Sequence, residues 1–549
     1  MPFETTGPER KSLDREKFLQ EVNRGQTWDF VVVGGGATGL GVALDAAARG
    51  FKTLLLEQAD FAKGTSSRST KLVHGGVRYL AQGNISLVFE ALYERGLLLQ
   101  NAPHLVRVQS FVIPNYSFFN KVFYGVGLKI YDLMAGRYRF QKTSVLSRQS
   151  VMRLLPNIKT ADLNGGIEYF DGQFDDARLA LNLAQTCVEQ GGVVLNYARV
   201  TGLLKDAAGK VAGVKFRDLE GGQDYELAAK VVINATGVFV DDILQLDSPA
   251  QQPLVRPSQG VHVVLDSSFL GGDNALMIPK TPDGRVLFVV PWHGHLLVGT
   301  TDTPLEDSSL EPRALEDEID FILETAGQYL VRKPSRKDVL SVFAGLRPLA
   351  APGKDTGSTK EISRGHKLLV APSNLVTITG GKWTTYRRMA QDTVDKALEV
   401  AGLKPVACQT ANLKVHGHAR KHAGRPHLGI YGTDAAPIQA LIQENPKLGQ
   451  QLHPSFPNTL AEVYWAVHNE MARTVEDVLA RRLRILFLNA RVAMDMAPKV
   501  AAIMAAQLGQ GTDWQQQQVA SFNALAQNYL LEPYTPAKTQ DIEIMNYKL

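Results

Sequence analysis

The sequence predicts an α/β fold in which a nucleotide-binding parallel sheet carries an inserted α+β unit and precedes an all-helical C-terminal domain. Three observations predict this fold. A strand, a glycine-rich turn, a helix and a second strand follow one another near the N-terminus. Short apolar strands then recur up to about residue 402, and beyond residue 403 the pattern becomes mostly helical. The 549 residues suffice for about three domains.

The first unit is built from three adjoining segments. Trp28–Val33 is an apolar run typical of a strand that is buried on both faces. Ala37–Arg49 is rich in Ala and Leu and is followed by a glycine, which predicts a helix and its end. Thr53–Leu56 predicts the next parallel strand. Together these segments predict a βαβ unit.

The turn of this unit carries the spacing Gly34-x-Gly36-x-x-Gly39. Gly34 permits the tight turn, Gly36 lets the backbone approach a pyrophosphate, and Gly39 lets the helix pack on the strand. The helix N-terminus supplies free N–H groups for an anion. Glu57, after the second strand, can accept hydrogen bonds from ribose hydroxyls. The pattern predicts a Rossmann-like dinucleotide site but does not separate FAD from NAD.

Three further segments favour FAD. Ala62–Tyr79 is rich in Ser, Thr and Gly, and offers hydroxyl and backbone donors to a pyrophosphate and a ribityl chain. Val231–Gly237 is a buried strand that ends in small residues, and Val376–Tyr386 is a strand, a glycine pair and a helix start. The predicted cofactor-binding residues are Gly34, Gly36, Gly39, Glu57, Thr65, Ser66, Ser67, Thr70, Lys71, His74, Gly75, Gly76, Ala235, Gly237, Gly380, Gly381, Lys382 and Thr384.

The chain resembles a known family in its motifs. TSSRSTKLVHGGVRYL, FDDARL, NATGVFVDDI, VGTTDTP, GLRPL and TGGKWTTYR are similar to motifs of FAD-dependent glycerol-3-phosphate dehydrogenases, in the D-amino-acid-oxidase-like flavoprotein group. The resemblance runs from about Trp28 to Arg388 and continues more weakly into the tail. It implies oxidation of sn-glycerol 3-phosphate at C2 to dihydroxyacetone phosphate, with a hydride passing to FAD and electrons passing to a quinone.

A phosphorylated substrate needs fixed positive charge. Arg78, Arg347 and Arg364 are the candidates, and the resemblance places all three near substrate. Lys382 stands at a helix start, where a cation is unfavourable unless an anion such as the flavin or the phosphate pairs with it. Tyr79 is expected to hydrogen-bond the substrate.

Oxidation of an alcohol also needs a base for the hydroxyl proton. His262, on an apolar strand, is the first candidate because an ordinary histidine pKa of about 6.5 suits proton transfer at neutral pH. His74 is the competitor, although its glycine-rich loop indicates a role in orienting flavin. Thr300, Thr301 and Asp302 are expected near the site in a less defined role. The predicted catalytic residues are His262, Arg347 and Lys382.

The predicted domains follow from these segments. Residues 25–110, 171–262 and 340–402 form a discontinuous FAD-binding domain, residues 111–170 and 263–339 form the substrate-binding domain, and residues 403–549 form the helical C-terminal domain. Within the last domain the pattern predicts helices over Leu460–Ala497, Lys499–Leu508 and Trp514–Tyr529.

One segment predicts membrane contact. Phe118–Phe140 intersperses apolar and aromatic residues with Lys121, Lys129, Arg137 and Arg139, which suits an interfacial element on anionic lipid. A helix that faces the core with basic edges is the alternative. No run of about 18 apolar residues predicts a bilayer-spanning helix, and no secretory signal is expected. We expect a cytoplasmic protein bound peripherally to the inner face of the cell membrane.

Composition limits the other functions. The net charge of +4, from 59 basic and 55 acidic residues, gives no indication of nucleic-acid binding. Cys187 and Cys408 are far apart, and no metal site or disulfide is expected. The alternatives are an oxidase that reduces oxygen to hydrogen peroxide, an amino-acid oxidase, and a non-catalytic flavin-stabilised scaffold. A homodimer is considered as the assembly.

Overall fold

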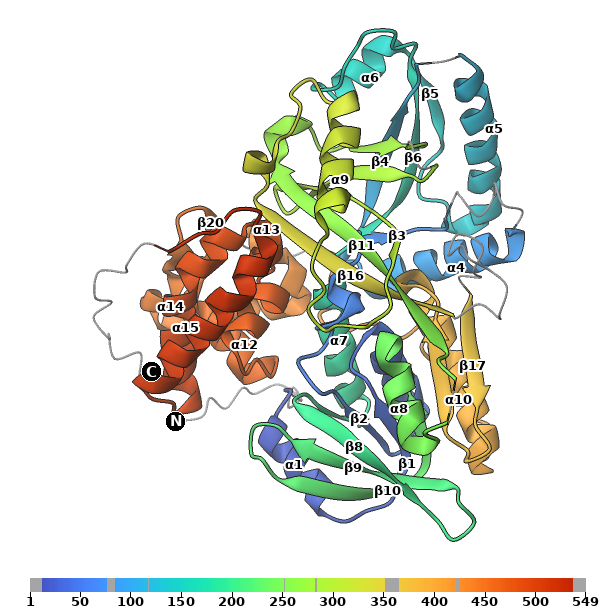
Figure 1. The fold of residues 1–549 in the computed structure, drawn as a ribbon, viewed down its shortest axis with the longest axis vertical. Coiled ribbons are helices and arrows are strands. Elements are labelled where there is room, and N and C mark those ends of the chain that lie inside the picture. Colours follow the sequence, from blue (N-terminus) through green and yellow to red (C-terminus); the bar gives the residue numbers. More distant parts are fainter. Residues whose placement is uncertain are drawn as a thin grey trace.

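The computed structural model describes residues 12–76, 84–116, 118–250, 252–281, 284–350, 365–420 and 425–536. Figure 1 shows two sheets stacked along the long axis of the molecule, with a body of helices beside them. The α/β class and the helical C-terminal domain predicted from the sequence are confirmed. No helix among these residues is long and apolar enough to span a membrane.

The first sheet contains the predicted βαβ unit. Strand β1 (Trp28–Val33) pairs in parallel with β2 (Thr53–Leu56) and β10 (Asp224–Asn234). The other strands of this sheet are β7 (Val193–Leu195), β8 (Ala198–Lys205), β9 (Val211–Asp218), β17 (His366–Val370) and β18 (Val376–Gly380). The strand order is β17-β18-β10-β1-β2-β7.

Three helices pack around the central strands. Helix α2 (Ala37–Ala48) is buried along most of its length and contacts α7 (Asp176–Glu189) and α10 (Tyr386–Ala401). Its many Ala and Gly residues, with a methyl group or no side chain at all, allow this close packing from both sides. Two further helices contact this sheet: α1 (Arg15–Asn23) contacts β7, and α8 (Val240–Asp247) contacts β8.

The second sheet is mainly antiparallel, and helices lie around it on several sides (Figure 1). Its strands are β3 (Leu72–Val73), β4 (Val106–Pro114), β5 (Ser144–Leu146), β6 (Gly166–Phe174), β11 (Val255–Asp266), β12 (Ala275–Ile278), β13 (Leu287–Trp292), β14 (His295–Gly299), β15 (Thr303–Pro304) and β16 (Ser341–Ala350). Its helices are α4 (Ile85–Asn101), α5 (Phe118–Ala135), α6 (Arg148–Leu154) and α9 (Glu316–Tyr329). The predicted domain limits assign residues 255–262 and 341–350 to the FAD-binding domain, whereas β11 and β16 pair with each other in this second sheet.

The C-terminal domain is mostly helical but also holds a two-stranded ribbon of β19 (Gln451–His453) and β20 (Phe456–Thr459). Its helices are α11 (Ala435–Glu444), α12 (Leu460–Asn469), α13 (Ile485–Leu488), α14 (Ala490–Leu508) and α15 (Thr512–Ala526), with a π-helical turn at Asp477–Arg482. Its core includes Trp292 and Phe343 of the second sheet.

The single helix predicted over Leu460–Ala497 is wrong. Met471 and Arg484 adopt left-handed backbone angles, with φ of 54° and 68°, which interrupt a right-handed helix. The predicted boundary before Lys499 is also wrong, because α14 continues through Pro498.

Candidate active site

The glycine turn has the geometry that a dinucleotide cradle requires. Gly34 adopts φ of +111°, and a Cβ there would lie 2.7 Å from the carbonyl oxygen of Ala235. A Cβ on Gly39 would lie 1.9 Å from the Gly34 carbonyl oxygen. Side chains at these positions would therefore clash with backbone, so the glycines allow the turn to close and α2 to pack against it.

Glu57 is fixed at the end of β2. Its carboxylate accepts hydrogen bonds from the Gly35 N–H at 2.6 Å and the Ala59 N–H at 2.8 Å. Burial raises the pKa of Glu57, and the two backbone donors oppose that shift. The carboxylate is thus held beside the glycine turn, where the ribose of a dinucleotide would lie.

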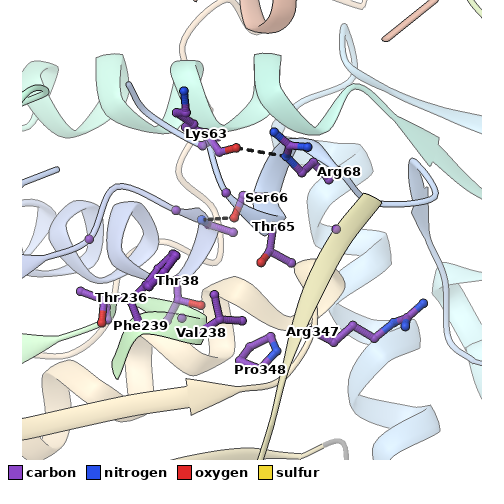
Figure 2. Close-up of a pocket in the computed structure, with 18 of the residues that line it drawn as sticks. Thr38, Lys63, Thr65, Ser66, Arg68, Thr236, Val238, Phe239, Arg347 and Pro348 are labelled. Carbon is purple, nitrogen blue, oxygen red and sulfur yellow. Dashed lines mark hydrogen bonds between the residues drawn. The ribbon is translucent and has the colours of Figure 1, made fainter. Parts of the chain in front are cut away.

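A cavity of ≈ 710 Å³ begins at this turn and reaches the second sheet. Figure 2 shows Thr38, Thr65, Thr236 and Val238 around it. The predicted residues that line it are Gly34, Gly36, Glu57, Thr65, Ser66, Thr70, His74, Ala235, Gly237, His262, Arg347, Gly380, Gly381, Lys382 and Thr384. The predicted residues outside its lining are Gly39, Ser67, Lys71, Gly75 and Gly76. Arg78, Tyr79 and Arg364 lie outside the described residues.

The loop after β2 is tied to three other elements. The Ser66 hydroxyl accepts the Ala37 N–H at 2.9 Å, at the start of α2. The Thr65 hydroxyl donates to the Leu346 carbonyl at 2.6 Å, and the Trp383 indole donates to the Ser66 carbonyl at 2.9 Å. The Ser/Thr-rich loop therefore joins the glycine turn, β16 and the segment after β18 around one cavity.

His262 lies on β11, where the second sheet meets the cavity. Its Nε2 is 2.9 Å from the Thr70 hydroxyl, and its ring stacks on Phe343 at 5.1 Å between centroids. Its Nδ1 is buried and has no hydrogen-bond partner among the described residues. A Cβ on Gly299, opposite His262 in β14, would lie 2.4 Å from the imidazole, so this glycine makes room for the ring.

The expectation that His262 has an ordinary histidine pKa is wrong. Burial lowers it well below the ordinary value of 6.5, and the nearby charges of Lys71 and Arg347 lower it further. The imidazole is therefore neutral at physiological pH and able to accept a proton. An anion bound to Arg347 in the cavity would oppose the downward shift and make His262 a stronger base.

Arg347 lies on the same face of the second sheet, and Figure 2 shows it leaving β16 on the opposite side from Pro348. Its guanidinium donates to the Thr301 carbonyl at 2.9 Å and to the Thr300 hydroxyl and an Asp302 carboxylate oxygen at 3.2 Å. The role of the VGTTD motif in the structure is therefore to orient Arg347. A Cβ on Gly260 would lie 2.3 Å from the guanidinium, so a small residue is required there.

The position of the Lys71 side chain was not predicted from the sequence pattern. It was expected to bind the cofactor, but its side chain is fully buried outside the cavity. Its ammonium donates to Asp176 at 2.7 Å and to the Ser67 carbonyl at 2.6 Å. Burial lowers its pKa to about 7, against the attraction of Asp176. A cation in a Ser/Thr-rich loop indicates anion binding, and only tertiary contacts show that the anion is a protein carboxylate.

Several cavity residues were missed. Arg199 and Thr201 on β8, Phe239 and Asp242 near the start of α8, and Trp383 also line the cavity. Trp383 stands inside the TGGKWTTYR motif, so the motif was the available signal. The residues of β8 have no local signal, because they reach the cavity only through the pairing of β8 with β9 at one side of the first sheet.

The fold and this cavity define a dinucleotide-dependent oxidoreductase with a flavoprotein architecture. The narrow glycine turn, the fixed Glu57 carboxylate and a cavity that extends to a buried histidine fit FAD, whose flavin would lie beyond the pyrophosphate.

Comparison with known proteins supports this class. Residues 29–387 match the family "FAD dependent oxidoreductase", and residues 373–519 match the "C-terminal domain of alpha-glycerophosphate oxidase". The chain is 40% identical over 527 residues to a probable mitochondrial glycerol-3-phosphate dehydrogenase of Caenorhabditis elegans, covering 90% of this chain and 72% of the relative. It is 38% identical over 533 residues to the mitochondrial glycerol-3-phosphate dehydrogenase of Rattus norvegicus, covering 91% and 73%.

A solved structure shares the whole architecture. The FAD complex of the glycerol-3-phosphate dehydrogenase of Bacillus halodurans superposes with a TM-score of 0.76 at 28% identity, covering 95% of this chain and 99% of that one. The chain belongs to the family of FAD-dependent glycerol-3-phosphate dehydrogenases, and FAD is its cofactor.

Proposed function

We propose that the protein oxidises sn-glycerol 3-phosphate to dihydroxyacetone phosphate. The observation that carries this proposal is the placement of a neutral histidine and an oriented arginine in one cavity. His262 and Arg347 lie on neighbouring antiparallel strands, and their side chains share one face of the second sheet. A proton acceptor beside a phosphate-binding cation suits a small phosphorylated alcohol.

We assign the residues of the site separate roles in the oxidation. FAD, when bound, would supply the acceptor for the hydride on C2 of the substrate. The Thr70 hydroxyl lines the cavity 2.9 Å from Nε2 of His262, so it can relay the substrate's hydroxyl proton to that atom. The imidazole holds the proton as a cation and later releases it to water. Arg347 and Lys382 bind the phosphate, which also offsets the positive charge that builds up around His262.

We also propose that the electrons pass to a membrane quinone. Two neighbouring helices present apolar side chains to solvent: Ile85, Phe89 and Tyr93 on α4, and Ile130 and Leu133 on α5. Leu133 is 75% exposed, and Lys129 and Arg137 are exposed nearby. Apolar groups flanked by cations suit peripheral contact with an anionic membrane, from which a quinone can be reached.

An oxidase reaction is the second candidate, because residues 373–519 match the C-terminal domain of a glycerophosphate oxidase. Steady-state turnover with sn-glycerol 3-phosphate distinguishes the two acceptors. The proposal predicts rapid reduction of a short-chain ubiquinone analogue and little peroxide in air-saturated buffer. Stoichiometric hydrogen peroxide with no reduction of the analogue would contradict the quinone proposal and support the oxidase.

A further inference from the structure

The loop from Gln58 to Lys71 separates the cavity from the C-terminal domain. On one side, Thr65, Ser66 and Thr70 line the cavity. On the other side, buried charged side chains of the C-terminal domain contact the same loop. Contacts with the C-terminal domain can therefore affect the positions of the loop residues that line the cavity.

The contacts begin in the first half of the loop. Asp60 is fully buried and accepts hydrogen bonds from both Arg481 and Arg482. Lys63 donates to the Glu476 carboxylate at 2.7 Å. These three ion pairs anchor the first half of the loop.

The second half of the loop is held by Arg484 through Asp176. The Arg484 guanidinium donates to the Ser67 carbonyl at 3.0 Å and to Asp176 Oδ1 at 2.9 Å. Asp176 Oδ2 accepts from the Lys71 ammonium and the Ser69 hydroxyl, each at 2.7 Å. One arginine and one carboxylate thus fix the residues on either side of Thr70.

We propose that Arg484 is a positioning residue that holds the Thr70 hydroxyl against His262. Arg484 is 1% exposed, and its guanidinium donates from Nη2 to the Ser67 carbonyl and Asp176 and from Nη1 to the Ala480 carbonyl of its own domain. A lysine ammonium lacks this planar pair of nitrogens and cannot reproduce all three bonds at once. This assigns the C-terminal domain a part in the chemistry, although none of its residues that the structure describes lines the cavity. The proposal rests on the proposed function, in which Thr70 relays the substrate's proton to His262.

A merely structural role is the competing explanation, and Arg178 provides the matched control. Arg178 is also 1% exposed and pairs with Glu470 of the C-terminal domain. It lies on α7 and has no bond to the loop, so Arg178→Lys disturbs the same domain interface without touching the segment around Thr70.

The experiment compares Arg484→Lys and Arg178→Lys as FAD-loaded full-length proteins. In anaerobic stopped-flow mixing with sn-glycerol 3-phosphate, Arg484→Lys is expected to lower the limiting rate of flavin reduction at least about tenfold, with the half-saturating concentration changed less than about twofold. Arg178→Lys is expected to stay within about twofold of the wild type in both quantities. Equal effects of the two substitutions would overturn the proposal.

Hydrogen–deuterium exchange supplies a readout that does not depend on activity. Backbone amides of residues 64–71 are expected to exchange faster in Arg484→Lys than in Arg178→Lys. If Arg484→Lys does not retain FAD, Ser69→Ala replaces it, since this change removes the hydroxyl's bonds to Asp176 and to the Lys71 N–H without changing any charge. Unchanged exchange and an unchanged reduction rate in Ser69→Ala would equally overturn the proposal. A wild type that sn-glycerol 3-phosphate does not reduce would instead refute the proposed function.

Discussion

At the scale of single residues, the site depends on how charges surround one neutral histidine. His262 is buried, and the nearby cations Lys71 and Arg347 both disfavour its protonated form. The sequence identified the histidine and the arginine as candidates. It could not predict the pKa, because the desolvation and the Lys71 charge arise from tertiary contacts.

Replacing Lys71 with Met should move the pH dependence of flavin reduction. The reaction requires neutral His262, so the rate falls as pH drops through the His262 pKa. Removing the Lys71 charge raises that pKa, and the inflection should therefore move to higher pH. Stopped-flow reduction between about pH 4 and 8 measures the shift, because the wild-type inflection lies well below the ordinary histidine value of 6.5. Lys215→Met is the control, because Lys215 lies outside the cavity lining and pairs at the surface with Glu226. Identical profiles for the two variants would refute this account of the His262 environment.

Arg347→Ala should weaken substrate binding while FAD stays bound. A guanidinium that is oriented by Thr301 and Asp302 can bind phosphate oxygens with little reorganisation. We expect the Michaelis constant for sn-glycerol 3-phosphate to rise by about a hundredfold, or about 2.7 kcal/mol. Arg336→Ala, which removes an arginine paired at the surface with Glu316 and Asp320, should leave it unchanged. An unchanged constant in Arg347→Ala would exclude the phosphate role.

At the scale of elements, strands and helices with strong local patterns were predictable. Strand β1 and helix α2 lie where the sequence placed them, because apolar periodicity and the glycine turn act locally. The breaks at Met471 and Arg484 were not predicted. Left-handed backbone at such residues is maintained by tertiary contacts, including the bonds of Arg484 to Asp176 and Ser67.

Helix α5 was predicted to contact a membrane. In the structure it has one buried face and one exposed face. Leu128 and Tyr131 are buried, whereas Ile130 and Leu133 are exposed. We expect the protein to float with liposomes that contain anionic lipid, and Leu133→Glu to reduce the bound fraction because a carboxylate is repelled and costly to desolvate. Val331→Glu is the control at another exposed apolar position, with 65% exposure. The membrane prediction fails if the wild type stays in the soluble fraction.

At the scale of the whole molecule, the sequence predicted the order of the three parts but not how they meet. Asp60 and Arg481 are 421 residues apart, and no local pattern connects them. In the structure they belong to one buried charge cluster, which joins the C-terminal domain to the loop beside the cavity. The placement of Lys71 outside the cavity has the same cause, because its partner Asp176 lies 105 residues away.

The visible spectrum of the purified, FAD-loaded protein under anaerobic conditions tests the central claim most directly. The account predicts that sn-glycerol 3-phosphate bleaches the flavin absorption, whereas glycerol, which lacks the phosphate that Arg347 would bind, leaves it almost unchanged at the same concentration. A flavin that persists in sn-glycerol 3-phosphate, or that glycerol bleaches equally well, would contradict the account.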